Sequence, residues 1–236
     1  MNKRILGLFL VILCCTSGIA SAEWTTPLQV AVFNPIQLFP AKGSVFGLRL
    51  NLMYSDNIYS TGLSLSTGWT RTEEDMKGIQ LGLVNWADGS TYGIQGGFLN
   101  YAGRRFVGLG LGMVNVIMTE TTGIQLGLTN WNHELLHGIQ LSAVNHVGGD
   151  FVGLQMGLIN MVKSNFSGFQ SGIINHVRAG TTGFQVGFFN FSRRMTGLQF
   201  GLINATDSLG GFQIGLVNIN GESESMPYMP FINWAF

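Results

Sequence analysis

The eight residues GIQLGLVN, from Gly78 to Asn85, are repeated along this chain with small changes. The next three copies read GIQGGFLN (93–100), GLGLGMVN (108–115) and GIQLGLTN (123–130). Glycine stands first and asparagine stands eighth in every copy. Because the unit holds almost no group that performs chemistry, its regularity indicates a repeated piece of structure.

The repeat organises nearly the whole chain. Units open every fifteen residues from Gly78 to Gly183, and two more follow at spacings of fourteen. Glutamine holds the third position in all of these units except one, where Gly110 replaces it. Weaker copies extend the array from PLQVAVFN (27–34) to MPYMPFIN (226–233) and bring the total to 14 units. We therefore expect one domain, residues 23–236.

Each unit has the alternation of a β-strand. In residues 78–85 the second, fourth and sixth side chains are apolar, whereas the first, third and fifth residues are Gly, Gln and Gly. This period of two is typical of a sheet with unlike faces. Polar stretches such as ADGS (87–90) and VGGD (147–150) separate the units and read as turns.

Two architectures fit one strand per repeat. In an antiparallel meander, about 14 short strands run up and down and close as a β-barrel. In a parallel β-solenoid, successive coils stack, and the glutamines and asparagines form hydrogen-bonded ladders. The ladder explains an asparagine in every unit, whereas the meander gives that asparagine no special role.

Four observations favour the barrel. Only one polar turn cluster occurs per unit, although a solenoid coil needs at least two corners. The sixth and seventh residues are both large and apolar, so both faces of the strand would have to be buried, one against lipid and the other in a packed lumen. Turns with acidic residues and turns with basic residues tend to alternate along the chain, as expected if successive turns lie at opposite ends of a meander. The chain ends at Phe236, as outer-membrane barrel strands do. We predict an all-β barrel in which Gln80 faces the lumen and Leu81 faces lipid, with the solenoid as the alternative.

The first residues resemble a secretory signal peptide. Lys3 and Arg4 precede an apolar run from Ile5 to Cys15, and Ala20-Ser21-Ala22 is typical of a cleavage site. We expect residues 1–22 to be removed after Ala22. Both cysteines, Cys14 and Cys15, fall in this segment, so the exported chain would have no disulfide.

Charge and composition limit the kinds of partner that this protein can bind. Without Lys3 and Arg4, ten Lys and Arg face twelve Asp and Glu, a net charge of −2, which gives no electrostatic basis for nucleic-acid binding. Only 10% of residues are charged, far below the roughly 25% of ordinary soluble domains. We expect the outer membrane or cell surface as the location. The expected partners are outer-membrane lipid, the barrel-assembly machinery and extracellular ligands held by the turns.

The tandem units, together with FGLRLNLMYSDN (46–57) and PFINWAF (230–236), resemble the bacterial surface-repeat family known from leptospiral surface proteins. The resemblance covers Leu28 to Phe236. It implies an exported repeat protein without enzymatic activity. The second and third units depart from the pattern, with Arg49 and Ser64 in the glutamine position.

One motif points to catalysis. HELLH, from His133 to His137, has the spacing of a zinc-protease motif, in which two histidines on one helix face bind the metal and Glu134 activates water. It falls in a turn between two strands, where that geometry is lost. His146 and His176 each follow a unit asparagine and read as residues at a sheet end. We therefore predict no enzyme, no cofactor and no catalytic or metal site. The expected role is structural, pore-like or surface interaction, and the alternatives are a solenoid adhesion module and a metalloprotease.

Overall fold

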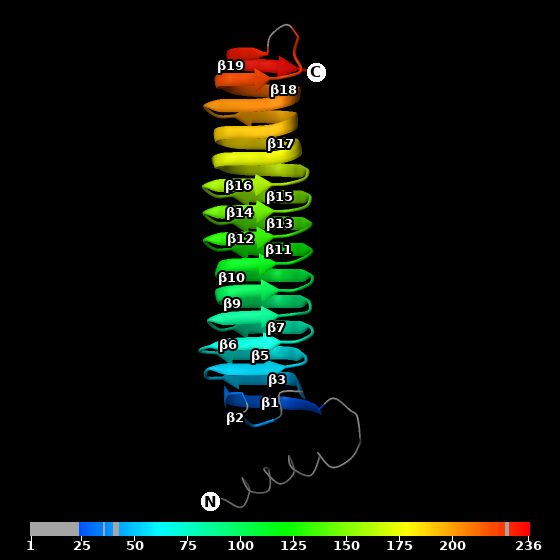
Figure 1. Ribbon diagram of the computed structural model, residues 1–236, viewed down its shortest axis with the longest axis vertical. Helices are drawn as coiled ribbons and strands as arrows, with labels where there is room; N and C mark the ends of the chain where they lie inside the picture. Colours follow the sequence, from blue (N-terminus) through cyan, green and yellow to red (C-terminus); the bar gives the residue numbers. More distant parts are fainter. Residues whose placement is uncertain (1–23, 35, 40–42, 225–226) are drawn as a thin grey trace, which may run out of the picture.

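The computed structural model describes residues 24–34, 36–39, 43–224 and 227–236, and these form one elongated column of stacked coils (Figure 1). The expected signal peptide, residues 1–22, lies outside the described residues. In the described ranges, no helix has the length and apolar character needed to cross a membrane.

The strands wind around the column, and the longest of them, such as β17, continue through more than one coil. The strands are β1 (Trp24–Phe33), β2 (Ile36–Gln37), β3 (Gly43–Asn51), β4 (Tyr54–Asn57), β5 (Ser60–Ser66), β6 (Trp69–Thr72), β7 (Met76–Leu81), β8 (Val84–Ala87), β9 (Thr91–Ala102), β10 (Phe106–Ile117), β11 (Thr121–Leu126), β12 (Thr129–Asn132), β13 (Leu136–Leu141), β14 (Val144–Val147), β15 (Phe151–Met156), β16 (Ile159–Val162), β17 (Phe166–Phe200), β18 (Ile203–Asn220) and β19 (Tyr228–Ala235).

Each coil pairs in parallel with the next, residue for equivalent residue. Gly108 pairs with Gly123, and Asn115 pairs with Asn130. The all-β prediction is confirmed, but the antiparallel barrel is wrong and the parallel β-solenoid is the fold. In a meander, equivalent residues of neighbouring strands lie far apart. Here each side chain of a unit lies directly above the equivalent side chain of the previous unit.

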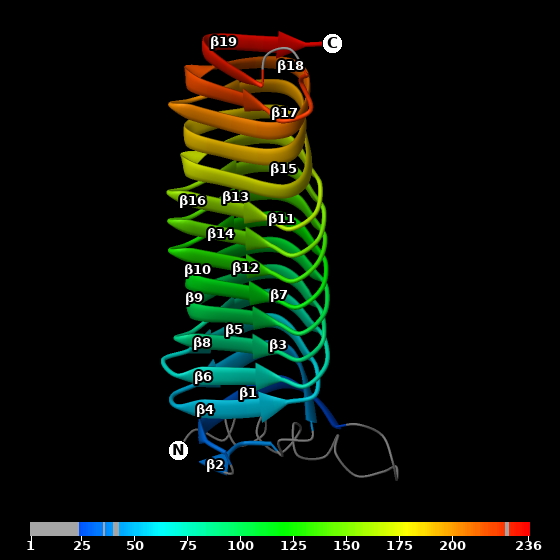
Figure 2. The ribbon, with the colours of Figure 1, turned by 45° about the horizontal axis from the view of Figure 1, so that its top comes forward.

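One repeat makes two strands rather than one. In the unit that opens at Gly138, β13 forms one side of the coil and β14 forms the other. A three-residue polar turn, 148–150, closes the coil at one edge, and a short bend at Ser142 and Ala143 closes the opposite edge (Figure 2). The barrel prediction counted only one corner per unit. This bend is the second corner, and it carries no charged residue.

The opening glycines let the coils approach. Twelve of them, from Gly47 to Gly211, have φ between 111° and 145°. A Cβ atom on Gly138 would lie closer than 3.0 Å to backbone atoms of Gly123, and the rest of the column repeats this contact. Only glycine adopts this backbone conformation without strain, and only glycine fits the space.

Changes in repeat length are absorbed at the corners. Arg193 and Arg194 form a two-residue turn in place of the usual three, which accounts for the first spacing of fourteen. The sixteen residues from Gly62 to Gly78 include an extra residue in the bend, since Thr67 and Gly68 stand where Leu83 alone stands one coil later. Ser55 and Thr70 therefore occupy the asparagine column instead of Tyr54 and Trp69.

The first and last units end the stack instead of continuing it. β1 pairs in parallel with β3, but the chain then reverses and β2 pairs antiparallel to β1. At the other end β19 runs antiparallel to β18, with Asn233 beside Gln213. The expectation that residues 226–233 form a fourteenth like unit is therefore wrong. Both ends of the column are closed by a reversed strand (Figure 1).

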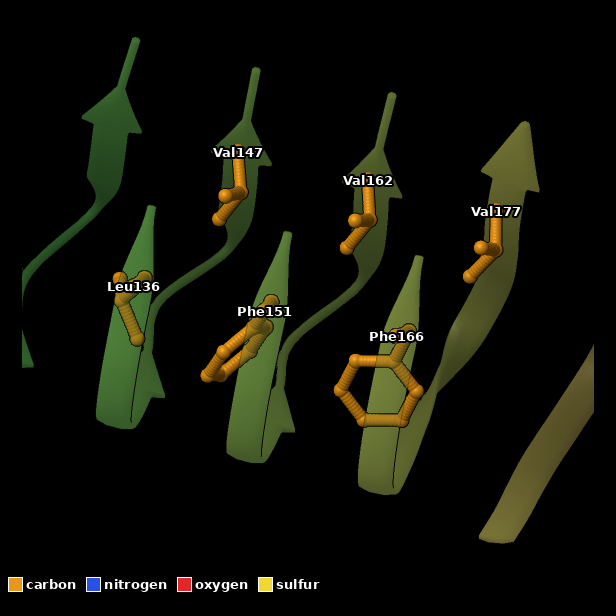
Figure 3. Packing of buried hydrophobic residues seen from close by; sticks show 6 residues of the cluster. All are labelled: Leu136, Val147, Phe151, Val162, Phe166 and Val177. Atoms are coloured by element: carbon orange, nitrogen blue, oxygen red, sulfur yellow. The ribbon is translucent and has the colours of Figure 1, made fainter. Parts of the chain in front are cut away.

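Half of the interior is largely apolar, with small polar residues such as Thr91, Thr121 and Asn132 in some coils. It is filled from one side by the residue two before each opening glycine and from the other side by the tenth residue of the unit. In the middle of the column these are Leu136, Phe151 and Phe166 against Val147, Val162 and Val177, all nearly inaccessible to solvent (Figure 3). Stacking identical coils thus aligns apolar side chains into two facing columns.

The other half of the interior is a pair of amide ladders. Each unit asparagine, from Asn85 onward, donates from Nδ2 to Oδ1 of the asparagine one coil later at 2.8 to 3.1 Å. The glutamines run in the opposite sense, each donating from Nε2 to the preceding coil at 2.7 to 3.0 Å. Gln80 is fully buried, so the prediction that it faces a lumen is wrong along with the barrel.

Arg49 occupies the glutamine column in the first full coil. Its Nε donates to Ser64 Oγ at 2.8 Å, and its Nη1 donates to Asn57 Oδ1 at 3.3 Å. The large Arg49 and the small Ser64 share the space of two glutamines, so the units that depart from the pattern keep its register. Burial lowers the pKa of Arg49 to about 10, because the guanidinium is removed from water.

The glutamine ladder is interrupted at one coil. Gly110 supplies no side chain, and the Nε2 of Gln125 has no hydrogen-bond partner among the described residues. A Cβ atom on Gly110 would lie 3.5 Å from the Cζ of Phe106, whose ring stands where Thr91 and Thr121 stand in the adjacent coils. Phe106 fills part of the space beside Gly110, but Phe151 and Phe166 occupy the same position in coils that keep their glutamines, Gln155 and Gln170.

This interruption predicts a stabilising substitution. Gly110→Gln should raise the free energy of unfolding by about 1 kcal/mol, because the new side chain offers an acceptor to Gln125 Nε2 and completes the ladder. Phe151 and Phe166 show that the core accommodates a phenylalanine beside a ladder glutamine. Chemical unfolding of the variant and the parent measures the difference. A loss of stability would show that the coil at Gly110 has no room for the glutamine.

Candidate functional site

The bend edge of the column carries an apolar ridge. We define the bend ridge as the residues at the sixth position of each unit, with the extra bend residue Met53. They are Leu52, Met53, Thr67, Leu83, Phe98, Met113, Leu128, Ala143, Leu158, Ile173, Phe188, Leu202 and Leu216. Phe98 and Phe188 remain 55% and 56% exposed. Exposed apolar area that is continuous over many coils is unusual for a monomer surface and marks an interaction site.

The backbone of this edge is hydrogen-bonded from coil to coil. The amide of Phe98 donates to the carbonyl of Leu83 at 2.9 Å, and the amide of Leu128 donates to Met113 at 2.9 Å. The fourth-position carbonyls also accept a second hydrogen bond from the buried asparagines, as Met156 does from Asn145 at 2.8 Å. The ridge therefore presents its side chains over a backbone that is already paired.

Two grooves lie on the ridge near the ends of the column. The larger has a volume of about 770 Å³ and is lined by residues of the first four coils, including Val30, Leu50 and Leu83. The smaller has a volume of about 400 Å³ and lies between Phe200, Leu216 and the closing strand β19. Both are apolar, and both follow the line where small fifth-position residues leave space between the fourth and sixth columns.

The charged side chains gather at the opposite edge. Apart from Arg49, Asp56, Arg71 and Lys77, every charged residue of the described ranges lies in a turn, next to a turn or in the loop before β19. Arg105 pairs there with Glu120 at 2.6 Å, and Arg104 with Glu74 at 3.6 Å. These pairs are exposed, so they contribute little stability. A hydrogen bond from Ser164 lowers the pKa of the Asp150 carboxyl, and the amide of Asn165 adds to the effect.

The face formed by β8, β12, β14 and their equivalents carries stacked rings. Trp86 lies over Tyr101 with ring centroids 3.8 Å apart, and Trp131 lies over His146 at 4.0 Å. Desolvation lowers the pKa of His146, and the neighbouring Lys163 and His133 add to this shift. Stacking one coil upon another thus brings together aromatic residues fifteen positions apart.

The HELLH segment forms a turn and the beginning of a strand. His133 and Glu134 lie in the turn before β13, Leu136 points into the core, and His137 stands exposed on β13. The helix that the zinc motif requires is absent at these residues. Among the described residues, no three His, Cys, Asp or Glu side chains gather closely enough to hold a metal ion.

The two histidines that follow unit asparagines both lie on the ring-bearing face. His146 stacks on Trp131, and His176 lies beside Phe191. The sequence reasoning placed the second, fourth and sixth residues outward, which is correct, but it assigned them to barrel lipid contacts and missed the ridge as a separate edge.

Neither a family model, nor a curated protein, nor a solved structure matches this chain. The candidate site therefore stands on the geometry of the bend ridge and the charged turn edge.

Proposed function

We propose that this protein is an exported, non-catalytic surface module, a β-solenoid that works by interaction through its bend ridge. The observation that carries the proposal is the segregation of the two edges. Charged side chains collect at the turns, and exposed apolar side chains run along the bends. An apolar stripe of this length serves contact with another apolar surface.

Repetition supports a role without chemistry. Catalysis needs a local constellation of unlike groups, such as a nucleophile, a base and an oxyanion-stabilising donor. Here the coils present nearly the same side chains along the column, and most of the buried asparagine and glutamine side chains are occupied by the ladders. Such columns provide long binding surfaces, as other solenoid proteins do. The resemblance to surface-repeat proteins and the apparent signal peptide agree with an exported module at the outer membrane or cell surface.

Surface labelling tests the proposal. A membrane-impermeant amine reagent applied to intact cells should label Lys77 and Lys163, which are exposed at the turn edge. Mass spectrometry should find a mature chain that begins at Glu23. A Lys77→Arg and Lys163→Arg variant controls for the sites of labelling. Labelling that occurs only after lysis, on a chain that retains residues 1–22, would refute the surface location.

A further inference from the structure

We infer that the occupant of the bend ridge is the lipid of a bilayer surface, on which the column lies lengthwise without crossing it. This inference rests on the proposed surface role and names its partner. Three properties of the bend edge support it: its paired backbone, its distance from the charges and its narrow shape.

The backbone pairing satisfies the main requirement of an apolar environment. A polar backbone group that loses water without gaining a partner is costly in lipid. At the bend edge the amides of Leu158 and Leu202 donate to the preceding coil at 3.0 Å, and the amide of Gly157 donates to the following coil at 3.0 Å. Apart from the amides of Leu83 and Ala143, for which no backbone acceptor is found among the described residues, the bend amides can therefore enter the acyl region already bonded.

The position of the charges sets the depth of contact. The bend and the turn edge are joined by the six residues of β13 on one side and the four residues of β14 on the other, about 20 Å and 13 Å at 3.3 Å per residue. Asp56 and Arg71 are the exceptions, since they lie in the same column as Trp86. Interfacial elements immerse their apolar side by about 5–10 Å, so the charged turns stay in water. Trp86 and Trp131 stand three residues from the ridge, about 10 Å away along the strand. This is the headgroup level that tryptophan favours.

The shape of the edge disfavours a second copy of the chain as the occupant. From Leu52 to Leu216 the ridge crosses eleven coil steps, about 50 Å at 4.8 Å per step. The edge is as wide as the two-layered coil, roughly 10 Å. The ridge alone, at about 500 Å², falls short of the roughly 800 Å² per partner of a stable protein interface. A second copy would also have to cover the exposed apolar side chains on the adjoining face, such as Leu81 and Met156. A fluid lipid surface, in contrast, adapts to a narrow convex ridge.

The test is flotation of the purified full chain with phosphatidylcholine vesicles. The protein should float with the vesicles. It should also stay bound when the salt concentration is raised to about 1 M, because the ridge carries no charge that salt could screen. Adding an anionic phospholipid should change the partition coefficient by less than about twofold. In a variant whose Trp24, Trp69 and Trp234 are replaced by phenylalanine, the emission of Trp86 and Trp131 should shift to the blue on binding, as expected for rings that leave water.

Matched triple variants identify the surface. Leu83→Thr, Leu128→Thr and Leu158→Thr together should lower the partition coefficient by about tenfold or more. Threonine is compatible with the bend, since Thr67 occupies it naturally. The control is Tyr92→Thr, Val107→Thr and Val152→Thr, at a position near the turn edge where Thr122 and Thr182 already stand. It should bind within about twofold of the parent, and both variants should keep the parent's circular dichroism spectrum.

Three results would overturn the inference: a parent chain that does not float, a ridge variant that binds as well as the parent, or a control variant that binds as poorly as the ridge variant. A parent dimer in sedimentation that the ridge variant converts to monomer, without flotation, would assign the ridge to a second copy instead. Surface labelling of cells is independent of these outcomes, so a failure of the lipid inference is distinguishable from a failure of the surface role.

Discussion

Replacing Gly153 by alanine is expected to lower the free energy of unfolding by more than about 4 kcal/mol, in the range reserved for severe backbone and packing conflicts. Gly153 has φ 142°, and a Cβ atom there would lie closer than 3.0 Å to backbone atoms of Gly138. Because the obstacle is backbone, no side chain can move aside. The two coils would have to separate, which would also stretch the ladders on either side.

Gly210→Ala provides the control. Gly210 has no unfavourable φ, and its added Cβ would meet neighbouring atoms only at 3.7 Å or beyond. Its substitution should be neutral or stabilising by up to about 1 kcal/mol, because alanine restricts the unfolded chain. Chemical denaturation of both variants gives the comparison. Equal stabilities for Gly153→Ala and the parent would show that the glycine columns do not set the coil spacing.

Asn160→Asp should have the second large effect. Asn160 Nδ2 donates to Asn175 Oδ1 at 2.8 Å and to the carbonyl of Ser171 at 2.7 Å. An aspartate of the same shape would direct acceptor oxygens at both acceptors and would bury a charge. We expect a loss of more than about 4 kcal/mol at pH 7, since an unpaired buried charge and broken hydrogen bonds both destabilise.

The loss should depend on pH. Burial and the surrounding acceptors disfavour the carboxylate, so they raise the folded-state pKa of the introduced Asp above its unfolded value of about 3.9. The protonated form can donate one hydrogen bond, so the variant should regain stability as the pH falls from 7 toward 4. The control Thr182→Asp, exposed on a strand near the turn edge, should cost about 1 kcal/mol or less. Thermal unfolding from pH 4 to pH 8 measures both, and a pH-independent loss at Asn160 would exclude a buried carboxylate.

The repeat predicted much of this fold because its periodicity is physical. Glycine at the first position, the outward second and fourth residues and the polar turns all follow from one coil geometry repeated along the axis. The asparagine at the eighth position was the feature that a barrel left unexplained. Its side chain bonds its own counterpart one coil away, as Asn145 does with Asn160 at 2.9 Å. Such a contact exists only where equivalent residues stack.

The error arose at the bend. Ser142 and Ala143, or Gly82 and Leu83, turn the chain without a charged residue or a proline. A sequence reading that takes corners from polar clusters therefore finds one turn and infers one long strand. The bend also explains why the sixth and seventh residues are both apolar and both outward. The chain changes direction between them, so the sixth side chain points outward from the bend and the seventh points outward from the strand that follows.

Two further signals for the barrel have different causes. The acidic and basic turns that seemed to alternate between two ends all lie on one edge, where Arg105 pairs with Glu120 from the next coil. Phe236 follows the closing strand β19 and is 94% exposed. The bend ridge could not be derived from the repeat alone, because it depends on which residues the second corner turns outward.

Distances between spin labels test the solenoid most directly. Pairs of cysteines at Leu83 with Leu128, Leu158 or Leu202, in a chain whose Cys14 and Cys15 are serine, place labels three, five and eight coils apart on the ridge. Pulsed dipolar spectroscopy should give distances near 14, 24 and 38 Å, because each coil adds about 4.8 Å. Distances that stop rising along the chain, or that do not scale with coil number, would contradict a parallel, in-register column.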